Sequence, residues 1–259
     1  MDCDHIAIKL RYIGTAYHGW QRQKNAVTVQ QIVERAVSGA LGSEVKVTGC
    51  GRTDAGVHAK EYAANFSAKC SIPCEKLPLA LNARLPDDVA VLDACRVSEG
   101  FHSVFSCVRK EYTYIIYNSR LRDPFYVNRA CFIPEKLDIG LMRQAAAGMT
   151  GTHDFAALRS VGTNVKTTVR TVYGFDIQRS GDIIKLRISA NGFLYNMARA
   201  MAGTAVYAGL GKIGPGEIED ILRSGNRCLA GPTMPADGLY MTRAEYEEEP
   251  VRSMMDGRG

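Results

Sequence analysis

The chain has 259 residues, of which 46% are hydrophobic and 23% charged, values typical of a soluble globular protein with one large domain or two smaller ones. The first residues, MDCDHIAIKL, lack the basic start and apolar run of a signal peptide. The most apolar long window, 193–211, is interrupted by Asn196 and Arg199, which favours a buried helix over a membrane span. We therefore expect a cytoplasmic protein with no membrane partner.

The formal net charge is +5, and it is distributed unevenly. The last fifteen residues, 245–259, contribute −3, so the rest of the chain carries +8. Basic residues gather in 108–129, interleaved with tyrosines and phenylalanines, as on many surfaces that bind nucleic acid. A solvated strand edge explains the same composition equally well, so both interpretations stay open.

Eight cysteines are scattered through the sequence, and without a secretory signal we expect reduced thiols, most of them in the core. Cys70 and Cys74 are the only close pair, and no histidine lies near them. This spacing predicts no zinc site and disfavours a metal-binding protein. A metal assay on the purified protein distinguishes that alternative.

The first half alternates strand and helix patterns in a β-α-β-β-α-β-like order that ends near residue 106. Thr28 and Gln31 are spaced as a capping box at the start of the first helix. The expected elements are a strand at 5–14, a helix at 28–42, strands at 44–50 and 62–68, a short helix at 76–85 and a strand at 88–97.

The second half repeats strands followed by helices, which predicts an α+β protein with a largely antiparallel sheet. The expected elements are a strand at 111–118, a loop at 119–136, a helix at 137–151, a hairpin at 168–190, helices at 193–210 and 215–225, and a strand at 238–246. We expect domains at 1–106 and 107–246, followed by a disordered acidic tail at 247–259.

A GxGxxG pattern at Gly209, Gly211 and Gly214 follows a predicted helix instead of a strand. A dinucleotide site requires the opposite order, so this pattern indicates a helix end and a turn.

The stretch GCGRTDAGVHA, residues 49–59, is predicted to join two strands. A plain turn explains part of it, because Asp54 can bond its own backbone and Gly56 can take a positive φ. The density of small residues around Arg52 and Asp54 favours a functional loop, in which glycines let a bulky ligand approach the backbone.

Four ordered stretches resemble the TruA family of tRNA pseudouridine synthases, and together they span nearly the whole chain. They are YIGTAYHGWQRQ (12–23), GRTDAGVHA (51–59), FHSVFSCVRKEYTYIIYN (101–118) and NGFLYNMARAMAGT (191–204). The resemblance implies the pseudouridine synthase fold, with two ferredoxin-like or RRM-like halves forming a mixed, largely antiparallel sheet flanked by helices. It also implies a homodimer that needs no cofactor or metal.

The activity implied by the resemblance is the isomerisation of uridine to pseudouridine at positions 38, 39 and 40 of the tRNA anticodon stem-loop. Asp54 matches the catalytic aspartate, and a carboxylate can act as a nucleophile or stabilise a cationic sugar. Arg52 matches the residue that helps to flip the target base out of the stem. Tyr112 matches a tyrosine that packs on the flipped uracil, and Arg199 an arginine that pairs with the aspartate.

The resemblance also suggests residues that touch the tRNA, although Val104 stands where many members carry arginine. These residues are Phe101, His102, Ser103, Val104, Phe105 and Arg120, together with Tyr112 as a substrate-binding residue. We expect His58 to order the loop instead of acting as an acid or base, and His18, Trp20, Gln21 and Gln23 to shape the loop against the sheet.

A different class of function is a non-catalytic RNA-binding module or chaperone that keeps the fold. Such a protein would tolerate the loss of Asp54, yet Asp54, Tyr112 and Arg199 are all present. Release of tritium from uridine C5 in tRNA distinguishes the two, because only the isomerisation removes the C5 hydrogen.

Overall fold

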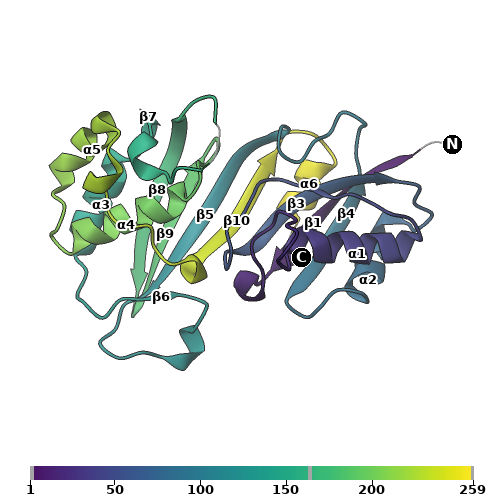
Figure 1. The fold of residues 1–259 in the computed structure, drawn as a ribbon, viewed down its shortest axis with the longest axis horizontal. Helices are drawn as coiled ribbons and strands as arrows, with labels where there is room; N and C mark the ends of the chain where they lie inside the picture. The colour runs from purple at the N-terminus through teal and green to yellow at the C-terminus, as the bar shows by residue number, and fades with distance from the viewer. Residues whose placement is uncertain (1–2, 163–164, 258–259) are drawn as a thin grey trace. The chain divides into compact units, whose positions relative to one another are not determined.

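The structure is a computed structural model that describes residues 3–162 and 165–257 and divides into two compact units (Figure 1). The first unit comprises Met1–Lys110 and Tyr240–Gly259, and the second comprises Glu111–Leu239. The division therefore falls close to the boundary predicted at 106/107. The final strand differs from the prediction, because it belongs almost wholly to the first unit.

Ten strands and six α-helices are present among the described residues, and most of the pairings are antiparallel. This confirms the α+β class and the largely antiparallel sheet. In the first unit the strand order is β4-β1-β3-β10, with β2 paired to β3. Its elements are β1 (Asp4–Tyr12), α1 (Val29–Leu41), β2 (Thr48–Gly49), β3 (His58–Ala68), α2 (Leu77–Asn82), β4 (Val89–Arg96), β10 (Leu239–Tyr246) and α6 (Val251–Asp256).

Strand β10 joins the first unit by pairing in parallel with β3, where Tyr240 lies opposite His58 and Met241 opposite Ala59. β1 pairs antiparallel with both β3 and β4. Sequence periodicity predicts a strand at 238–246 but carries no information about its partner strand. Adjacency in sequence alone therefore assigns this strand to the second half, 107–246.

The expected disorder of the C-terminal tail is wrong. Residues Val251–Asp256 form α6, and the side chains of Val251, Met254 and Met255 are buried. The helix packs against β1 and β4. The acidic run is typical of disordered segments, but burial of these three apolar side chains stabilises the short helix against the sheet.

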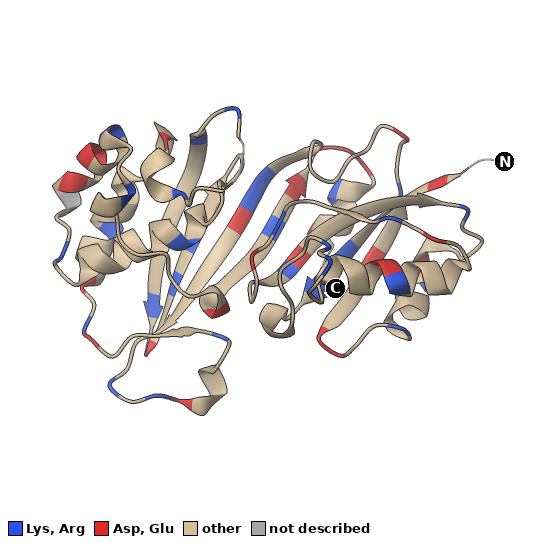
Figure 2. Ribbon diagram, viewed as in Figure 1, with Lys and Arg blue, Asp and Glu red and all other residues tan. Residues whose placement is uncertain are grey.

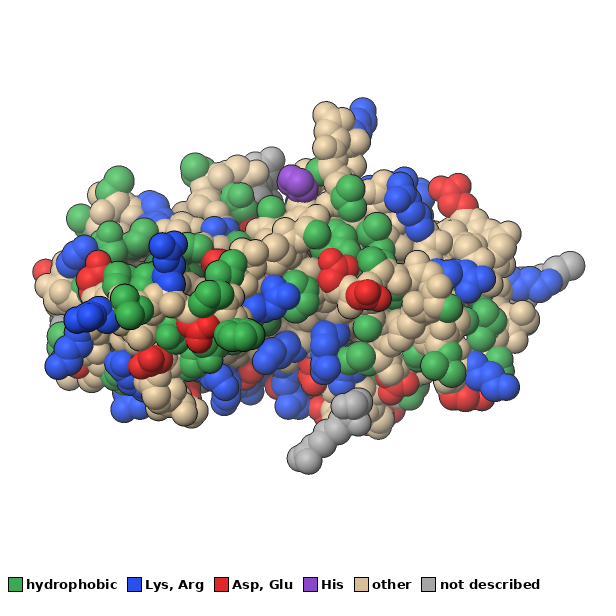
Figure 3. Space-filling view, turned by 90° about the horizontal axis from the view of Figure 1, so that it is seen from below, with side chains coloured by type: hydrophobic (Ala, Val, Ile, Leu, Met, Phe, Trp, Pro, Cys, Tyr) green, Lys and Arg blue, Asp and Glu red, His purple; other side chains and the backbone are tan. Residues whose placement is uncertain are grey.

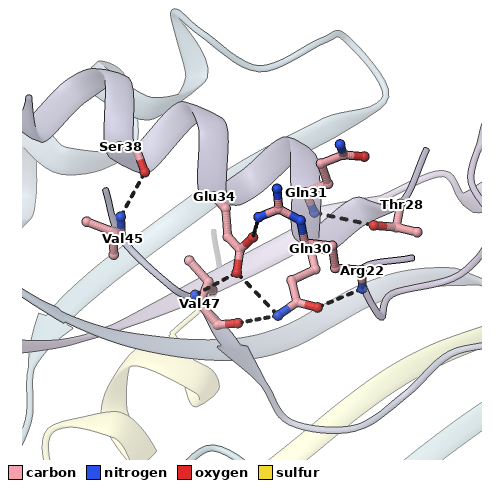
Figure 4. A network of polar contacts seen from close by, with 8 residues as sticks. All are labelled: Arg22, Thr28, Gln30, Gln31, Glu34, Ser38, Val45 and Val47. Atoms are coloured by element: carbon pink, nitrogen blue, oxygen red, sulfur yellow. Dashed lines mark hydrogen bonds and ion pairs between the residues drawn. The ribbon is translucent and has the colours of Figure 1, made fainter. Parts of the chain in front are cut away.

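Helix α1 begins as predicted, because the Thr28 hydroxyl accepts a hydrogen bond from the N–H of Gln31 (Figure 4). The strand predicted at 44–50 shrinks to β2. Val47 donates its N–H to the Glu34 carboxylate at 3.2 Å, and its carbonyl accepts from Gln30 at 2.9 Å (Figure 4). Side chains of α1 thus satisfy backbone groups that a longer strand would have paired with a neighbour.

In the second unit the strand order is β5-β9-β8-β7, with β6 parallel to β5. Its elements are β5 (Cys107–Tyr117), which begins in the first unit, β6 (Cys131–Phe132), α3 (Ile139–Gly148), β7 (Gly151–Asp154), β8 (Val169–Ser180), β9 (Ile183–Ala190), α4 (Met197–Gly209) and α5 (Ile218–Ser224). The predicted hairpin is confirmed, since β8 and β9 pair antiparallel around Gly181, which has a φ of 59°.

Helix α4 begins later than predicted, because its N-cap residue Asn196 has a left-handed φ of 61°. The GxGxxG pattern is a helix end followed by a turn, as expected: Gly209 is the last residue of α4, and Gly211 has a φ of 70°. Among the described residues, no helix is long and apolar enough to cross a membrane.

Candidate functional site

The loop from Gly49 to Ala59 joins β2 to β3 in the first unit, and the segment 17–20 holds it in place. Trp20 donates its backbone N–H to the Thr53 carbonyl at 3.2 Å, and Gly56 donates its backbone N–H to the Tyr17 carbonyl at 3.2 Å. Within the loop, Val57 donates to the Asp54 carbonyl at 3.1 Å, and Gly56 has a φ of 82°. The predicted turn and the predicted role of Trp20 in shaping the loop are both seen.

Aromatic side chains support this loop through ring packing and hydrogen bonds. The rings of Trp20 and Tyr62 lie 4.3 Å apart, and the Tyr62 hydroxyl donates a hydrogen bond to the Gly51 carbonyl. The Tyr12 hydroxyl lies 3.0 Å from the buried hydroxyl of Thr53. Alternation in the sequence places Tyr12 and Tyr62 on a strand face but does not reveal which loop that face supports.

The expectation that the glycines of this loop let a ligand approach the backbone does not hold for Gly49. A Cβ at Gly49 would collide with the Tyr62 hydroxyl and would lie 2.6 Å from Cζ2 of Trp20. Internal packing therefore requires glycine there. A Cβ at Gly51 would meet only the ammonium of Lys110, at 3.3 Å, so that position is open apart from one flexible side chain.

His58 is fully buried at the start of β3, and its Nδ1 accepts a hydrogen bond from the N–H of Gly14 at 2.9 Å. Its ring lies 4.6 Å from that of Tyr240. This agrees with the expectation that His58 orders the loop.

Arg52 and Asp54 stand on either side of the buried Thr53 in this loop. Arg52 is exposed and Asp54 is half-buried. The structure therefore places these two predicted site residues on one loop that backbone hydrogen bonds hold to the segment 17–20.

The segment 101–105 divides into buried and accessible residues. The Phe101 ring packs 5.5 Å from that of Tyr246, and the fully buried Ser103 donates its N–H and hydroxyl to the Asn65 amide oxygen at 2.9 and 2.6 Å. The side chains of Phe101 and Ser103 therefore hold the segment to the first unit, and little of their surface is left to touch a ligand. His102 and Val104 are half-buried. Phe105 is 84% exposed, and its ring lies 4.4 Å from that of His102.

In the second unit, Tyr112 lies on β5, a strand that carries basic and acidic residues (Figure 2). Its side chain is buried, and its ring meets Phe193 edge to face at 4.8 Å. On the same strand, Tyr114 and Ile116 are fully buried and Thr113 is buried as well.

Arg199 is held on α4 by two hydrogen bonds within the second unit. Its Nε donates to the Met234 carbonyl at 2.6 Å, and its Nη1 donates to the Asn196 amide oxygen at 2.8 Å. Asn196 in turn donates to the Ser160 hydroxyl at 2.8 Å. Burial raises the pKa of Asp237, and the positive charge of Arg199 opposes that rise. The guanidinium is therefore held in place by its neighbours in the second unit, and its pairing with Asp54 stays a prediction.

Arg120 is exposed in the loop between β5 and β6. The same loop exposes apolar side chains, and the stacked rings of Tyr117 and Tyr126, 4.7 Å apart, support it. The exposed apolar residues are Leu121, Phe125 and Val127. Hydrophobic side chains also lie among Lys and Arg side chains on the face drawn in Figure 3. This mixture suits contact with the bases and phosphates of RNA.

All eight cysteines are free thiols, and three of them, Cys50, Cys70 and Cys131, are buried. The expectation that most of them lie in the core is thus only partly met. Within residues 3–162 and 165–257, no group of three His, Cys, Asp or Glu side chains could hold a metal ion.

The sequence profile of the family described as tRNA pseudouridine synthase matches residues 8–106 and 145–247. A protein of Thermoanaerobacter sp. (strain X514), named tRNA pseudouridine synthase A, is 47% identical over 242 residues, which cover 93% of this chain and 99% of its own. A protein of the same name from Ruminiclostridium cellulolyticum is 43% identical, with the same coverage of both chains. The chain therefore belongs to the tRNA pseudouridine synthase family and is an enzyme that isomerises uridine to pseudouridine in tRNA.

Proposed function

We propose that this enzyme acts on uridines 38, 39 and 40 of the tRNA anticodon stem-loop, with Asp54 as its catalytic carboxylate. The observation that carries the assignment is the loop 49–59, which backbone hydrogen bonds hold to the segment 17–20 and in which Arg52 is exposed and Asp54 half-buried. The motifs that resemble the TruA family support the choice of substrate positions.

The reaction breaks the bond between N1 of uracil and C1′ of ribose, rotates the base and joins C5 to C1′. The proton on C5 is lost to a base, and N1 gains one. Asp54 serves this chemistry by attacking C1′ or by stabilising its positive charge, and then by assisting removal of the C5 proton. Tyr112 supports the uracil, and Arg199 acts as a positioning residue. No cofactor or metal is needed.

Arg52 is proposed to open the stem. Extruding a stacked base costs a few kcal/mol, which contacts to the vacated stack and its phosphates must offset. A planar guanidinium can stack on bases and bind a phosphate at once, and Arg52 is exposed at the tip of a fixed loop. His102, Val104, Phe105 and Arg120 extend the RNA contact, with Phe101 and Ser103 supporting the segment from within. The motif resemblance further supports a homodimer in the cytoplasm.

The test uses tRNA transcripts that carry tritium at C5 of a single uridine, at position 38, 39 or 40 or elsewhere. The wild type should release tritium from each of the first three, and Asp54→Ala should release none while still binding tRNA. Exposed Asp87→Ala is the matched control and should keep full activity. Release only from uridines outside these positions would refute the substrate assignment. Binding without release would instead favour the non-catalytic RNA-binding reading.

A further inference from the structure

Lys110 places an ammonium group against the loop that carries Arg52 and Asp54. The residue lies on the part of β5 that belongs to the first unit, and its side chain is half-buried. Its Nζ would lie 3.3 Å from a Cβ built on Gly51, so the ammonium sits directly beside the loop backbone. Because Gly51 has no side chain, nothing from this position covers the charge.

The Lys110 ammonium makes no hydrogen bond and no ion pair within residues 3–162 and 165–257. Lys9, the buried lysine of the same unit, differs in every respect: its Nζ donates to the carbonyls of Met255 and Gly257 at 2.9 Å each and lies 3.6 Å from the Glu61 carboxylate. The buried ammonium of Lys9 thus has three partners, whereas the half-buried ammonium of Lys110 has no anion among the described residues.

The charge of Lys110 acts on two nearby thiols, those of Cys50 and Cys107. Burial raises the pKa of the Cys50 thiol to about 12 and also raises the pKa of Cys107, and the charge of Lys110 only partly opposes these shifts. Both thiols are therefore neutral at physiological pH. A partly desolvated cation without a partner is unfavourable in the free protein, and an arriving anion would relieve that cost.

We propose that Lys110 binds a backbone phosphate of the RNA strand that lies on the loop 49–59, and so fixes the strand for Arg52 and Asp54. This inference rests on the proposed function of that loop. A compact ammonium on a flexible stem suits a single phosphate oxygen, whereas the planar group of Arg52 suits stacking, so the two cations serve different parts of the nucleotide. Lys110 is thereby a binding residue for RNA and takes no part in bond breaking.

The experiment measures tRNA affinity at several salt concentrations, together with KM and kcat from tritium release. The variants are Lys110→Met, Lys110→Arg and Lys110→Gln, with exposed Lys76→Met as the charge-matched control. Lys110→Met should weaken binding and raise KM by roughly 10-fold, reduce the slope of log affinity against log salt by about 1, and leave kcat within a few-fold of wild type. Lys110→Arg should restore most of the slope.

A lysine that served only the fold would lower the Tm when it is replaced. The proposal predicts that the Tm does not fall, because Lys110→Met removes an unpaired charge. Lys110→Gln repeats the test with a polar neutral side chain. Equal affinity and equal salt slope for Lys110→Met and Lys76→Met would overturn the proposal. A wild type that binds tRNA but releases no tritium would refute the proposed function, while the salt slopes would still decide the role of Lys110.

Discussion

The side chain of His58 joins β3 to the turn after β1, because its Nδ1 accepts a hydrogen bond from the N–H of Gly14 at 2.9 Å. The backbone around Gly14 lies so close to the backbone that precedes His58 that a Cβ at Gly14 would collide with the carbonyl of Val57. This contact fixes the end of the loop that carries Asp54, only four positions before His58.

His58→Ala should lower both stability and activity. The substitution removes a fully buried ring and leaves the Gly14 N–H without its acceptor, so we expect a loss of roughly 2–4 kcal/mol in the free energy of unfolding. Urea unfolding measures the first effect and tritium release the second. Exposed Asp87→Ala is the control. Equal stability of the two variants would show that the buried contact does not hold the loop.

Gly49→Ala and Gly51→Ala should differ sharply although they are two residues apart. The new methyl at 49 meets the hydroxyl of Tyr62 and the ring of Trp20, both of them buried, so we expect a loss of roughly 1–3 kcal/mol. The methyl at 51 meets only the mobile end of Lys110, so stability should change by less than about 0.5 kcal/mol. Thermal or urea unfolding of both variants tests this ordering, and its reversal would contradict the packing described for the loop.

Stability should fall as the pH rises above about 9, in part because of Cys50. Burial raises the pKa of this thiol to about 12, above the value of about 8.5 expected in the unfolded chain. Between these two values the unfolded state loses its proton first, so the free energy of unfolding decreases by up to about 1.4 kcal/mol per pH unit. Cys50→Ala should flatten this slope in urea titrations under reducing conditions. An unchanged slope would mean that other groups account for it.

Lys9→Met should loosen α6 without removing its apolar contacts. The carbonyls of Met255 and Gly257 lose their donor, and Glu61 loses its ion pair, so we expect a loss of about 1–3 kcal/mol. Hydrogen exchange of the amides in 251–257 should accelerate more than that of β1. Exposed Lys46→Met should change neither. Protection that remains unchanged would show that Val251, Met254 and Met255 suffice to hold the helix.

Several elements of the fold follow from local patterns. The alternation in 168–190 predicted the hairpin, and Thr28 predicted the start of α1, because a turn and a helix cap depend on residues close in sequence. The strand at 44–50 was shortened by α1 side chains, whose contacts with Val47 no local pattern contains.

By itself, the sequence determined the α+β class, the loop that carries Arg52 and Asp54, and the family, because ordered motifs and side-chain periods are properties of the linear chain. Only the tertiary structure decided that β10 lies beside β3, that α6 is ordered, and that Gly49 serves packing. It alone also distinguishes Lys110 from other basic residues. These features depend on which distant residues meet, and contacts across long sequence separations leave no periodic trace.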